Sequence, residues 1–249
     1  MVYKRVCTAQ TLKIKGLCVA QEGGAVADLN ESRNTPPRLG EMPNWRYLLR
    51  EFYDLYRYSS AGGSQRIRTH QKEVRHRLSR LMKLDPHLEL PTPQCKPVCS
   101  HLARTLDRGY SQLTGSIIRS IVHVQHELHW DFGYDKVPQG LRNKYAFSEI
   151  LGPRGPVMSE ELILGMVLFA PKTTYPTHSH QGITESYVCL SGAISENDVG
   201  MYAPGSMILN PPDHPHRITT GDNEPSLLAY AWVGDKEALV EHRMIFRRG

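Results

Sequence analysis

The sequence contains no internal repeat, no low-complexity tract and no apolar run approaching the roughly 18 residues that mark a membrane-spanning helix. We therefore expect no membrane partner. Residues 1–24 carry positive charge but lack the sustained apolar core of a secretory signal. These absences predict a soluble, cytoplasmic protein.

Disulfide bonds and a nucleic-acid partner are also excluded by what is missing. The cysteines number five, which is odd, and their spacing shows no disulfide framework. Cys95 and Cys99 form a C-x3-C pair without a second pair, so we interpret them as unpaired thiols rather than zinc ligands. The net charge of +5 comes from two local basic stretches, residues 66–80 and 243–249. A nucleic-acid-binding domain usually spreads basic side chains over a whole face, so we expect no nucleic-acid partner.

The distribution of apolar residues divides the chain into three parts, which together predict an α+β fold. Residues 1–42 form an irregular N-terminal segment rich in Gly, Pro, Asn and Ser. Residues 43–128 form a helical region, with apolar residues every three or four positions and a candidate break near Gly109. Residues 129–249 contain short β-rich runs separated by turns, which is typical of a sandwich or barrel. Each predicted helix has one apolar face, so the helices should pack on one another or on a sheet.

Within the β-rich part, the stretch YPTHSHQGITESYVCLSG (residues 175–192) combines metal-binding residue types at strand spacing. Alternate side chains of a strand point the same way, so His178 and His180 share one face. Glu185 can add a carboxylate. Two imidazoles and a carboxylate suit a divalent transition metal such as zinc, iron, manganese, nickel or cobalt. A further ligand should come from a distant strand, and PPDHPHRI offers His214 and His216.

These residues fall into two motifs that resemble those of the cupin family. The first is H-x-H-x4-E-x6-G, which ends at Gly192, and the second is a P-G turn at residues 204–205 followed by a late histidine. The resemblance implies a C-terminal cupin double-stranded β-helix, or jelly-roll barrel, with the helical region packed on it. One departure is Lys172, which stands where cupins usually have glycine six residues before the first histidine. The other is a longer second motif. HRI resembles the end of that motif and favours His216 as the fourth ligand, which leaves His214 at the site mouth or behind the ligands.

Two tyrosines accompany the predicted metal site. Tyr187 follows Glu185 by two residues and should share its face, while Tyr175 precedes the histidine pair at the same mouth. A free phenol has a pKa of about 10, and a nearby dication stabilises the phenolate. Tyr187 could therefore act as a general base toward a carbon-bound proton. Alternatively, it fills the barrel, with its hydroxyl bound to a neighbour.

A closer resemblance is to the cupin-type dimethylsulfoniopropionate (DMSP) lyases, and most of all to their DddL branch. It covers the chain from about Asn44 to the end and rests on residues 175–192 together with LHWDFGYDKVP, YAFSEILGP and LLAYAWVG. It implies a carbon–sulfur lyase that splits DMSP into dimethyl sulfide and acrylate. It also implies the following roles: metal ligands His178, His180, Glu185 and His216; catalytic base Tyr187; supporting tyrosine Tyr175.

The residues suit that reaction. A metal ion can hold the substrate carboxylate as a Lewis acid while Tyr187 removes the α-proton, and neutral dimethyl sulfide then leaves. The sulfonium cation requires aromatic faces, because a ring quadrupole attracts a cation. Candidates for substrate binding are Trp130, Tyr134, Tyr145 and Trp232, with Phe132 and Tyr230 as further aromatics.

Two other functions fit the same fold. An iron-dependent dioxygenase would use the same ligands but would not need Tyr187. A cupin without catalytic activity would bind a small ligand as a sensor or store. The helical region lacks the short glycine turn of a helix-turn-helix, so we interpret it as a cover over the barrel or as the surface of a homodimer.

Overall fold

The computed structural model describes residues 35–133, 137–241 and 244–246. Most of the predicted irregular segment, residues 1–34, lies outside the described residues, and so do Cys7, Cys18 and Tyr134. The helices and the sheets belong to a single compact unit, Pro36–Gly249. The predicted division of this unit into a helical region, residues 43–128, and a barrel, residues 129–249, stays a prediction.

Amphipathic helices form the first part of the described chain, as predicted. They and the short 3-10 turns are η1 (Leu39–Glu41), α2 (Pro43–Tyr58), α3 (Gln65–Leu84), η2 (Pro97–His101), α4 (Leu102–Gly109) and α5 (Gly115–Val124). The Ser64 side chain accepts a hydrogen bond from the Ile67 amide and so caps the start of α3. The predicted break at Gly109 is confirmed, because α4 ends there. A Cβ at this position would lie 2.9 Å from the Ile118 side chain, so glycine allows the close approach of α5.

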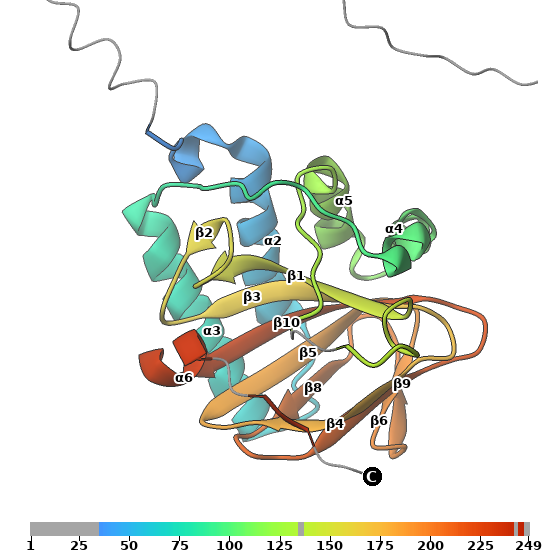
Figure 1. Ribbon diagram of the computed structural model, residues 1–249. Coiled ribbons are helices and arrows are strands. Elements are labelled where there is room, and N and C mark those ends of the chain that lie inside the picture. The colour runs from blue at the N-terminus through green and yellow to red at the C-terminus, as the bar shows by residue number, and fades with distance from the viewer. Residues whose placement is uncertain (1–34, 134–136, 242–243, 247–249) are drawn as a thin grey trace, which may run out of the picture. The chain divides into compact units, whose positions relative to one another are not determined.

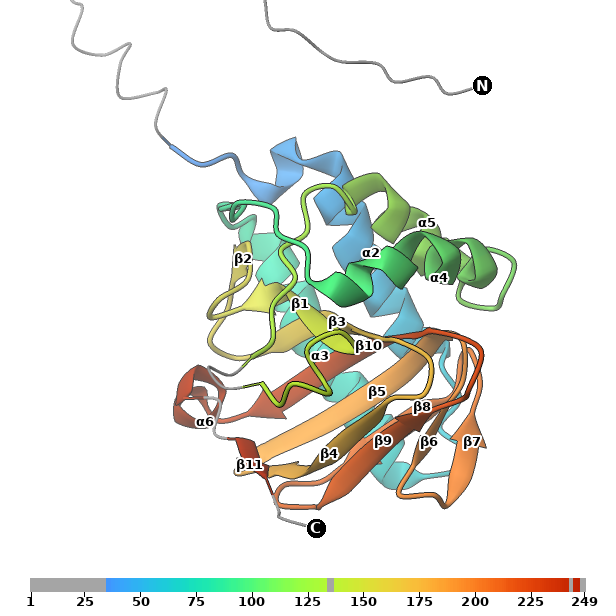
Figure 2. The ribbon, with the colours of Figure 1, turned by 45° about the vertical axis from the view of Figure 1, so that its right-hand side comes forward.

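The strands form two sheets that face each other (Figures 1 and 2). The first has the order β2-β1-β3-β10-β5-β8 and the second the order β11-β4-β9-β6-β7. Their bounds are β1 (Tyr145–Gly152), β2 (Val157–Met158), β3 (Ile163–Phe169), β4 (Thr174–His180), β5 (Ile183–Ser191), β6 (Ile194–Glu196), β7 (Gly200–Tyr202), β8 (Met207–Asn210), β9 (His216–Thr220), β10 (Ser226–Gly234) and β11 (Met244–Phe246); helix α6 (Lys236–Glu241) follows β10. This arrangement is the predicted α+β jelly roll.

Helices α2 to α5 lie on the outer side of the first sheet, so that sheet is buried on both faces (Figure 1). Strand β3 shows the consequence. Leu164, Met166 and Leu168 pack against the helices, whereas Val167 and Phe169 face the barrel interior. A strand buried on both faces has a continuous apolar sequence, which explains the run LILGMVLF.

Two turns account for the motif positions noted in the sequence. Gly192 has φ 78°, and a Cβ there would lie 2.4 Å from the Pro225 carbonyl oxygen, so only glycine fits. Lys172 has φ 54°, in the left-handed region that favours glycine. The chain thus keeps the left-handed turn at the position where cupins usually have glycine, although the residue is lysine.

Candidate metal centre and its cavity

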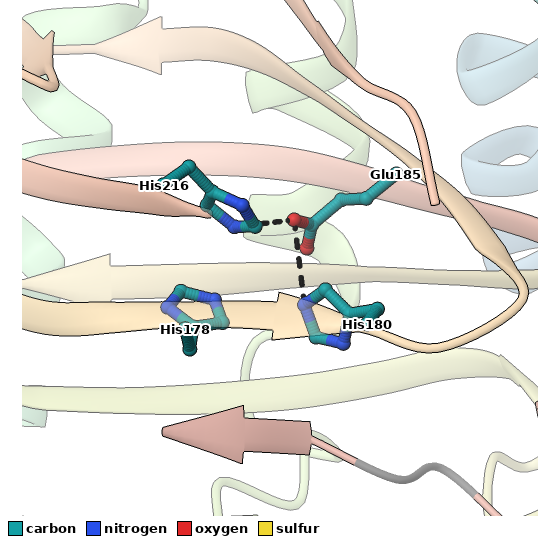
Figure 3. A group of neighbouring side chains, drawn as sticks. All are labelled: His178, His180, Glu185 and His216. Atoms are coloured by element: carbon teal, nitrogen blue, oxygen red, sulfur yellow. Dashed lines mark ion pairs between the residues drawn. The ribbon is translucent and has the colours of Figure 1, made fainter. Parts of the chain in front are cut away.

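Three strands bring the four predicted metal ligands together inside the barrel. His178 and His180 come from β4, Glu185 from β5 and His216 from β9 (Figure 3). All four side chains are buried, and their ligand atoms lie within 4.8 Å of one another. Alternation along β4 and β5 therefore points the predicted residues into one site.

The ligand atoms converge without forming hydrogen bonds to one another. His216 Nε2 lies 2.8 Å and His180 Nε2 lies 3.5 Å from Glu185 Oε2 (Figure 3). Within the described residues, none of these three atoms has a hydrogen-bond partner of acceptable geometry. Leaving a buried polar atom unpaired costs about 1–3 kcal/mol. A set of unpaired nitrogen and oxygen atoms aimed at one point fits a divalent metal ion, which would satisfy all of them at once.

Backbone carbonyls orient two of the imidazoles. His178 Nδ1 lies 2.9 Å from the Pro176 carbonyl oxygen, and His216 Nδ1 lies 3.1 Å from that of His214. If each Nδ1–H donates to its carbonyl, the Nε2 lone pair is left for a metal ion. Burial lowers the pKa of His178 to about 3, so this ring is neutral at physiological pH. Metal ions bind the neutral imidazole.

The indole of Trp232 orients the carboxylate. Trp232 and Glu185 pair directly across β10 and β5, and Trp232 Nε1 donates a hydrogen bond to Glu185 Oε1 at 2.7 Å. The other oxygen is thereby turned toward the imidazoles. Burial favours the protonated acid, but the adjacent His180 and His216 outweigh it and hold the pKa of Glu185 well below its usual range. The carboxylate is therefore ionised, as a metal ligand must be.

The two histidine candidates for the fourth ligand lie in different places. His216 belongs to the buried group, whereas the side chain of His214 is exposed. Burial opposes protonation of His216, yet the Glu185 carboxylate more than offsets this effect and raises the pKa of His216. His214 contributes its carbonyl oxygen as the partner of the His216 ring. The role of the His214 side chain stays a prediction.

A cavity of about 80 Å³ extends from this group, and Tyr175 and Tyr187 both line it. Tyr175 precedes His178 by three residues, which on a regular strand would point the two side chains in opposite directions. An irregularity in the pairing of β4 with β9 between these residues shifts the alternation of side chains, so that both residues point to the same side of the strand. The Tyr175 ring consequently packs edge-on against the His178 ring, with centroids 4.9 Å apart.

The protein groups around Tyr187 oppose its ionisation. Burial raises its pKa well above 10, and the Glu185 carboxylate adds to the effect. A cation held by Glu185 would act in the opposite direction, because it would replace a nearby negative charge with a positive one. Tyr187 could therefore titrate in a useful range only when the site holds a metal ion.

The predicted substrate-binding aromatics are only partly brought together. Trp232 lines the cavity, as do Tyr230 and Phe132. Trp130 is instead buried in the core between the helices and the first sheet. Tyr145 packs against the Tyr175 ring and donates a hydrogen bond to the Phe132 carbonyl, so it supports the wall rather than lining it.

The sequence reasoning missed several residues that line the cavity. Glu149 and Phe147 come from β1, and Arg154 follows that strand. Glu149 is the residue of greatest chemical interest, because it is a second carboxylate in a largely apolar cavity. In the run YAFSEILG, Phe147 and Glu149 are separated by one residue. This spacing is the one sequence pattern that could have indicated that the two side chains share a face of a strand.

Three histidines and a glutamate that could hold a metal ion, inside a jelly-roll barrel, define the protein as a member of the cupin class. Residues 70–228 match the family model described as dimethylsulfoniopropionate lyase, and the chain belongs to that family. It is 54% identical over 202 residues to a putative dimethylsulfoniopropionate lyase DddL of Cereibacter sphaeroides, a match that covers 81% of this chain and 87% of the relative.

Solved structures show the same fold. The DMSP lyase DddQ from Ruegeria pomeroyi superposes with a TM-score of 0.62 at 20% identity, over 82% of this chain and 96% of that one. A structure from a study of the DMSP lyases RdDddP and RnDddQII gives 0.61 at 19% identity, over 83% and 99%. The predicted resemblance and the predicted fold are therefore confirmed.

Proposed function

We propose that the protein is a metal-dependent lyase that cleaves DMSP to dimethyl sulfide and acrylate by β-elimination. The observation that carries this proposal is the group of four buried side chains whose ligand atoms converge beside a cavity that Glu185 and Tyr187 line, in a member of the DMSP lyase family. His178, His180, Glu185 and His216 would hold one divalent transition-metal ion. Imidazole and carboxylate suit zinc, iron, manganese, nickel or cobalt.

A bound metal ion would supply a Lewis acid for the substrate carboxylate, which makes the proton on the adjacent carbon easier to remove. Tyr187, ionised to the phenolate beside the cation, accepts that proton. The electron pair of the broken C–H bond forms the double bond of acrylate, the bond from the β-carbon to sulfur breaks, and sulfur leaves with its electrons as neutral dimethyl sulfide. The reaction involves no net redox change and no organic cofactor.

The place of Tyr187 supports its role as the general base. It is the residue of β5 that follows Glu185 on the same face, and both line the cavity. Tyr175 lines the opposite wall on β4 and packs on the ligand His178, so it would orient the substrate carboxylate or the Tyr187 hydroxyl. Burial of the base in an apolar cavity also keeps water away from the proton transfer.

The aromatic walls would receive the sulfonium end. Phe132, Tyr230 and Trp232 line the cavity, and a sulfonium next to ring faces gains cation–π attraction without hydrogen bonds. Tyr145 would act through the Phe132 carbonyl that it binds. Tyr134 and Trp130 stay predictions, the first because it lies outside the described residues and the second because it lies in the other core.

In the part of the chain that the structure describes, no helix combines the length and the apolar character needed to cross a membrane. We propose a cytoplasmic location, where a small molecule such as DMSP would be the partner. We also propose that the helical side forms the surface of a homodimer, because Tyr47, Tyr58 and Leu113 are exposed there. Light scattering at several protein concentrations checks the second point.

The proposed function is tested with purified protein loaded with each candidate metal, incubated with DMSP under strict anaerobiosis. We expect dimethyl sulfide in the headspace and an equal amount of acrylate in solution. His178→Ala is the matched control that should lose both metal and product. An oxygen requirement would favour a dioxygenase, and tight DMSP binding without any product would favour a cupin without catalytic activity.

A further inference from the structure

A single row of residues connects the base to a second carboxylate across the first sheet. Glu149 on β1 pairs with Gly165 on β3, Gly165 pairs with Tyr230 on β10, and Tyr230 pairs with Tyr187 on β5. Neighbouring strands lie about 4.8 Å apart, so the ends of the row are about 14 Å apart along the sheet. Glu149, Tyr230 and Tyr187 all line the cavity. The row thus runs from one end of the cavity to the other.

Gly165 leaves space in the middle of this row. A Cβ at this position would lie 2.5 Å from the Tyr230 hydroxyl oxygen, so the tyrosine ring lies over the glycine. The Tyr230 hydroxyl therefore reaches the region between the two carboxylates. Burial raises the pKa of Tyr230 well above 10, and Glu149 and Glu185 add to the effect in that order. The neutral Tyr230 hydroxyl thus belongs to a cavity that two acidic side chains, Glu149 and Glu185, also line.

Within the described residues, the Glu149 carboxylate forms no ion pair, although the Arg154 charge acts on it from a greater distance. Its Oε1 accepts a hydrogen bond from the Arg154 backbone amide at 2.8 Å. Among the described residues, no Lys, Arg or His nitrogen lies within 4.0 Å of this carboxylate, although the Arg154 side chain lines the same cavity. Burial raises the pKa of Glu149 to about 7. Glu149 is half-buried, and a carboxylate that lines a largely apolar cavity without an ion-pair partner suits a cationic ligand.

We propose that Glu149 binds the sulfonium group of the substrate and so determines selectivity for a cation. The inference rests on the proposed function, which places the substrate carboxylate at the metal ligands. The sulfonium then points away from the metal ligands and toward the part of the cavity that Glu149, Phe132 and Phe147 line. A sulfonium has no hydrogen to donate, so opposite charge and aromatic faces are the interactions available to it.

The same residue also lies on the route into the site. A larger depression of about 470 Å³ opens outside the inner cavity, and the two share the residues Phe132, Gly133, Phe147, Glu149 and Arg154. A negative charge in this passage attracts the cationic substrate. Dimethyl sulfide is neutral, so the attraction is lost when the carbon–sulfur bond breaks, and the product can leave. Because Glu149 interacts more strongly with the ground state than with the departing product, its removal should affect KM more than kcat.

The test compares the cationic substrate with an analogue whose sulfur carries no charge and one methyl group fewer. Glu149→Gln keeps the size of the side chain and an acceptor for the Arg154 amide but removes the negative charge. We would measure, by calorimetry on metal-loaded Tyr187→Phe protein, the Kd for DMSP and for 3-methylthiopropionate, a neutral thioether with the same carboxylate. The Tyr187→Phe background is needed because the active enzyme would consume DMSP during the titration. We expect Glu149→Gln to weaken DMSP binding about tenfold, as loss of a partly screened charge contact would, and to leave 3-methylthiopropionate binding unchanged.

Arg154→Gln is the matched control, because Arg154 lines the same passage with the opposite charge. It should not weaken DMSP binding. The inference is overturned if Glu149→Gln binds DMSP like the Tyr187→Phe parent, or if it weakens both ligands equally, which indicates a structural role. It is also overturned if Arg154→Gln weakens both ligands, because the substrate carboxylate would then lie at the passage. Release of dimethyl sulfide by the wild type separately tests the proposed function. The ratio of the Kd values for DMSP and 3-methylthiopropionate can be interpreted whether or not dimethyl sulfide is released.

Discussion

Trp232→Phe tests whether the Glu185 carboxylate is held in place for a metal ion. The indole Nε1–H of Trp232 donates to Glu185 Oε1 at 2.7 Å, and the ring packs against the His180 ring with centroids 4.5 Å apart. Phenylalanine keeps an aromatic ring in this place but removes the donor. A hydrogen bond to a charged group is worth about 1.5–3 kcal/mol, and loss of a group that orients a metal ligand typically lowers affinity about 10- to 100-fold. We expect a loss of metal affinity in that range.

The assay is competition between the metal-free protein and a chelator of known affinity, without substrate, because Trp232 also lines the cavity. Tyr230→Phe is the matched control, since it removes a polar atom from a neighbouring wall residue that forms no hydrogen bond with a ligand in the described chain. Circular dichroism checks that both variants fold. If Trp232→Phe binds metal within about twofold of wild type, the typical effect of an orienting group is absent and the reasoning is wrong.

Further substitutions separate the remaining roles. His178→Ala and Glu185→Ala should each lose metal and activity, and full metal occupancy by elemental analysis would contradict their assignment as ligands. His216→Ala should remove metal far more than His214→Ala, because His214 contributes only its carbonyl; the opposite ranking would move the role. Glu149→Gln should stabilise the metal-free protein against urea by about 3 kcal/mol at pH 8 but only about 1 kcal/mol at pH 5. The sign follows because the folded-state pKa of Glu149, about 7, exceeds the ordinary 4.5, so the cost of ionisation grows as pH rises through this window. Equal stabilisation at both pH values would show that Glu149 does not titrate as described.

Strand alternation made much of the site predictable. Neighbours two residues apart share a face, and this rule places His178 with His180 and Glu185 with Tyr187, as the structure does. The amphipathic helices were predictable for a similar reason, because their apolar stripes repeat every three or four residues. The resemblance to cupins added the distant ligand His216, which no local pattern could have connected to the others.

The details that the sequence could not supply depend on long-range packing. Tyr175 reaches the cavity only through an irregularity in the pairing of β4 with β9, which spacing alone does not reveal. Glu149 lies on β1, a strand that contributed to the family resemblance but whose mixed polar and apolar sequence predicted no role for this residue. Trp232 was predicted as a partner for the sulfonium, whereas its indole also holds Glu185. The bond depends on direct pairing of β10 with β5, which strand alternation does not indicate.

The central claim is that Tyr187 removes the α-proton, and Tyr187→Phe tests it most directly. The variant keeps the ring and the four metal ligands and loses only the hydroxyl. Metal content and Tm should stay close to wild type, while release of dimethyl sulfide should fall by at least about 10²-fold, the lower range for loss of a general base. Tyr175→Phe should be milder. If Tyr187→Phe retains most of its turnover while Tyr175→Phe is inactive, then Tyr175 is the base and the account is contradicted.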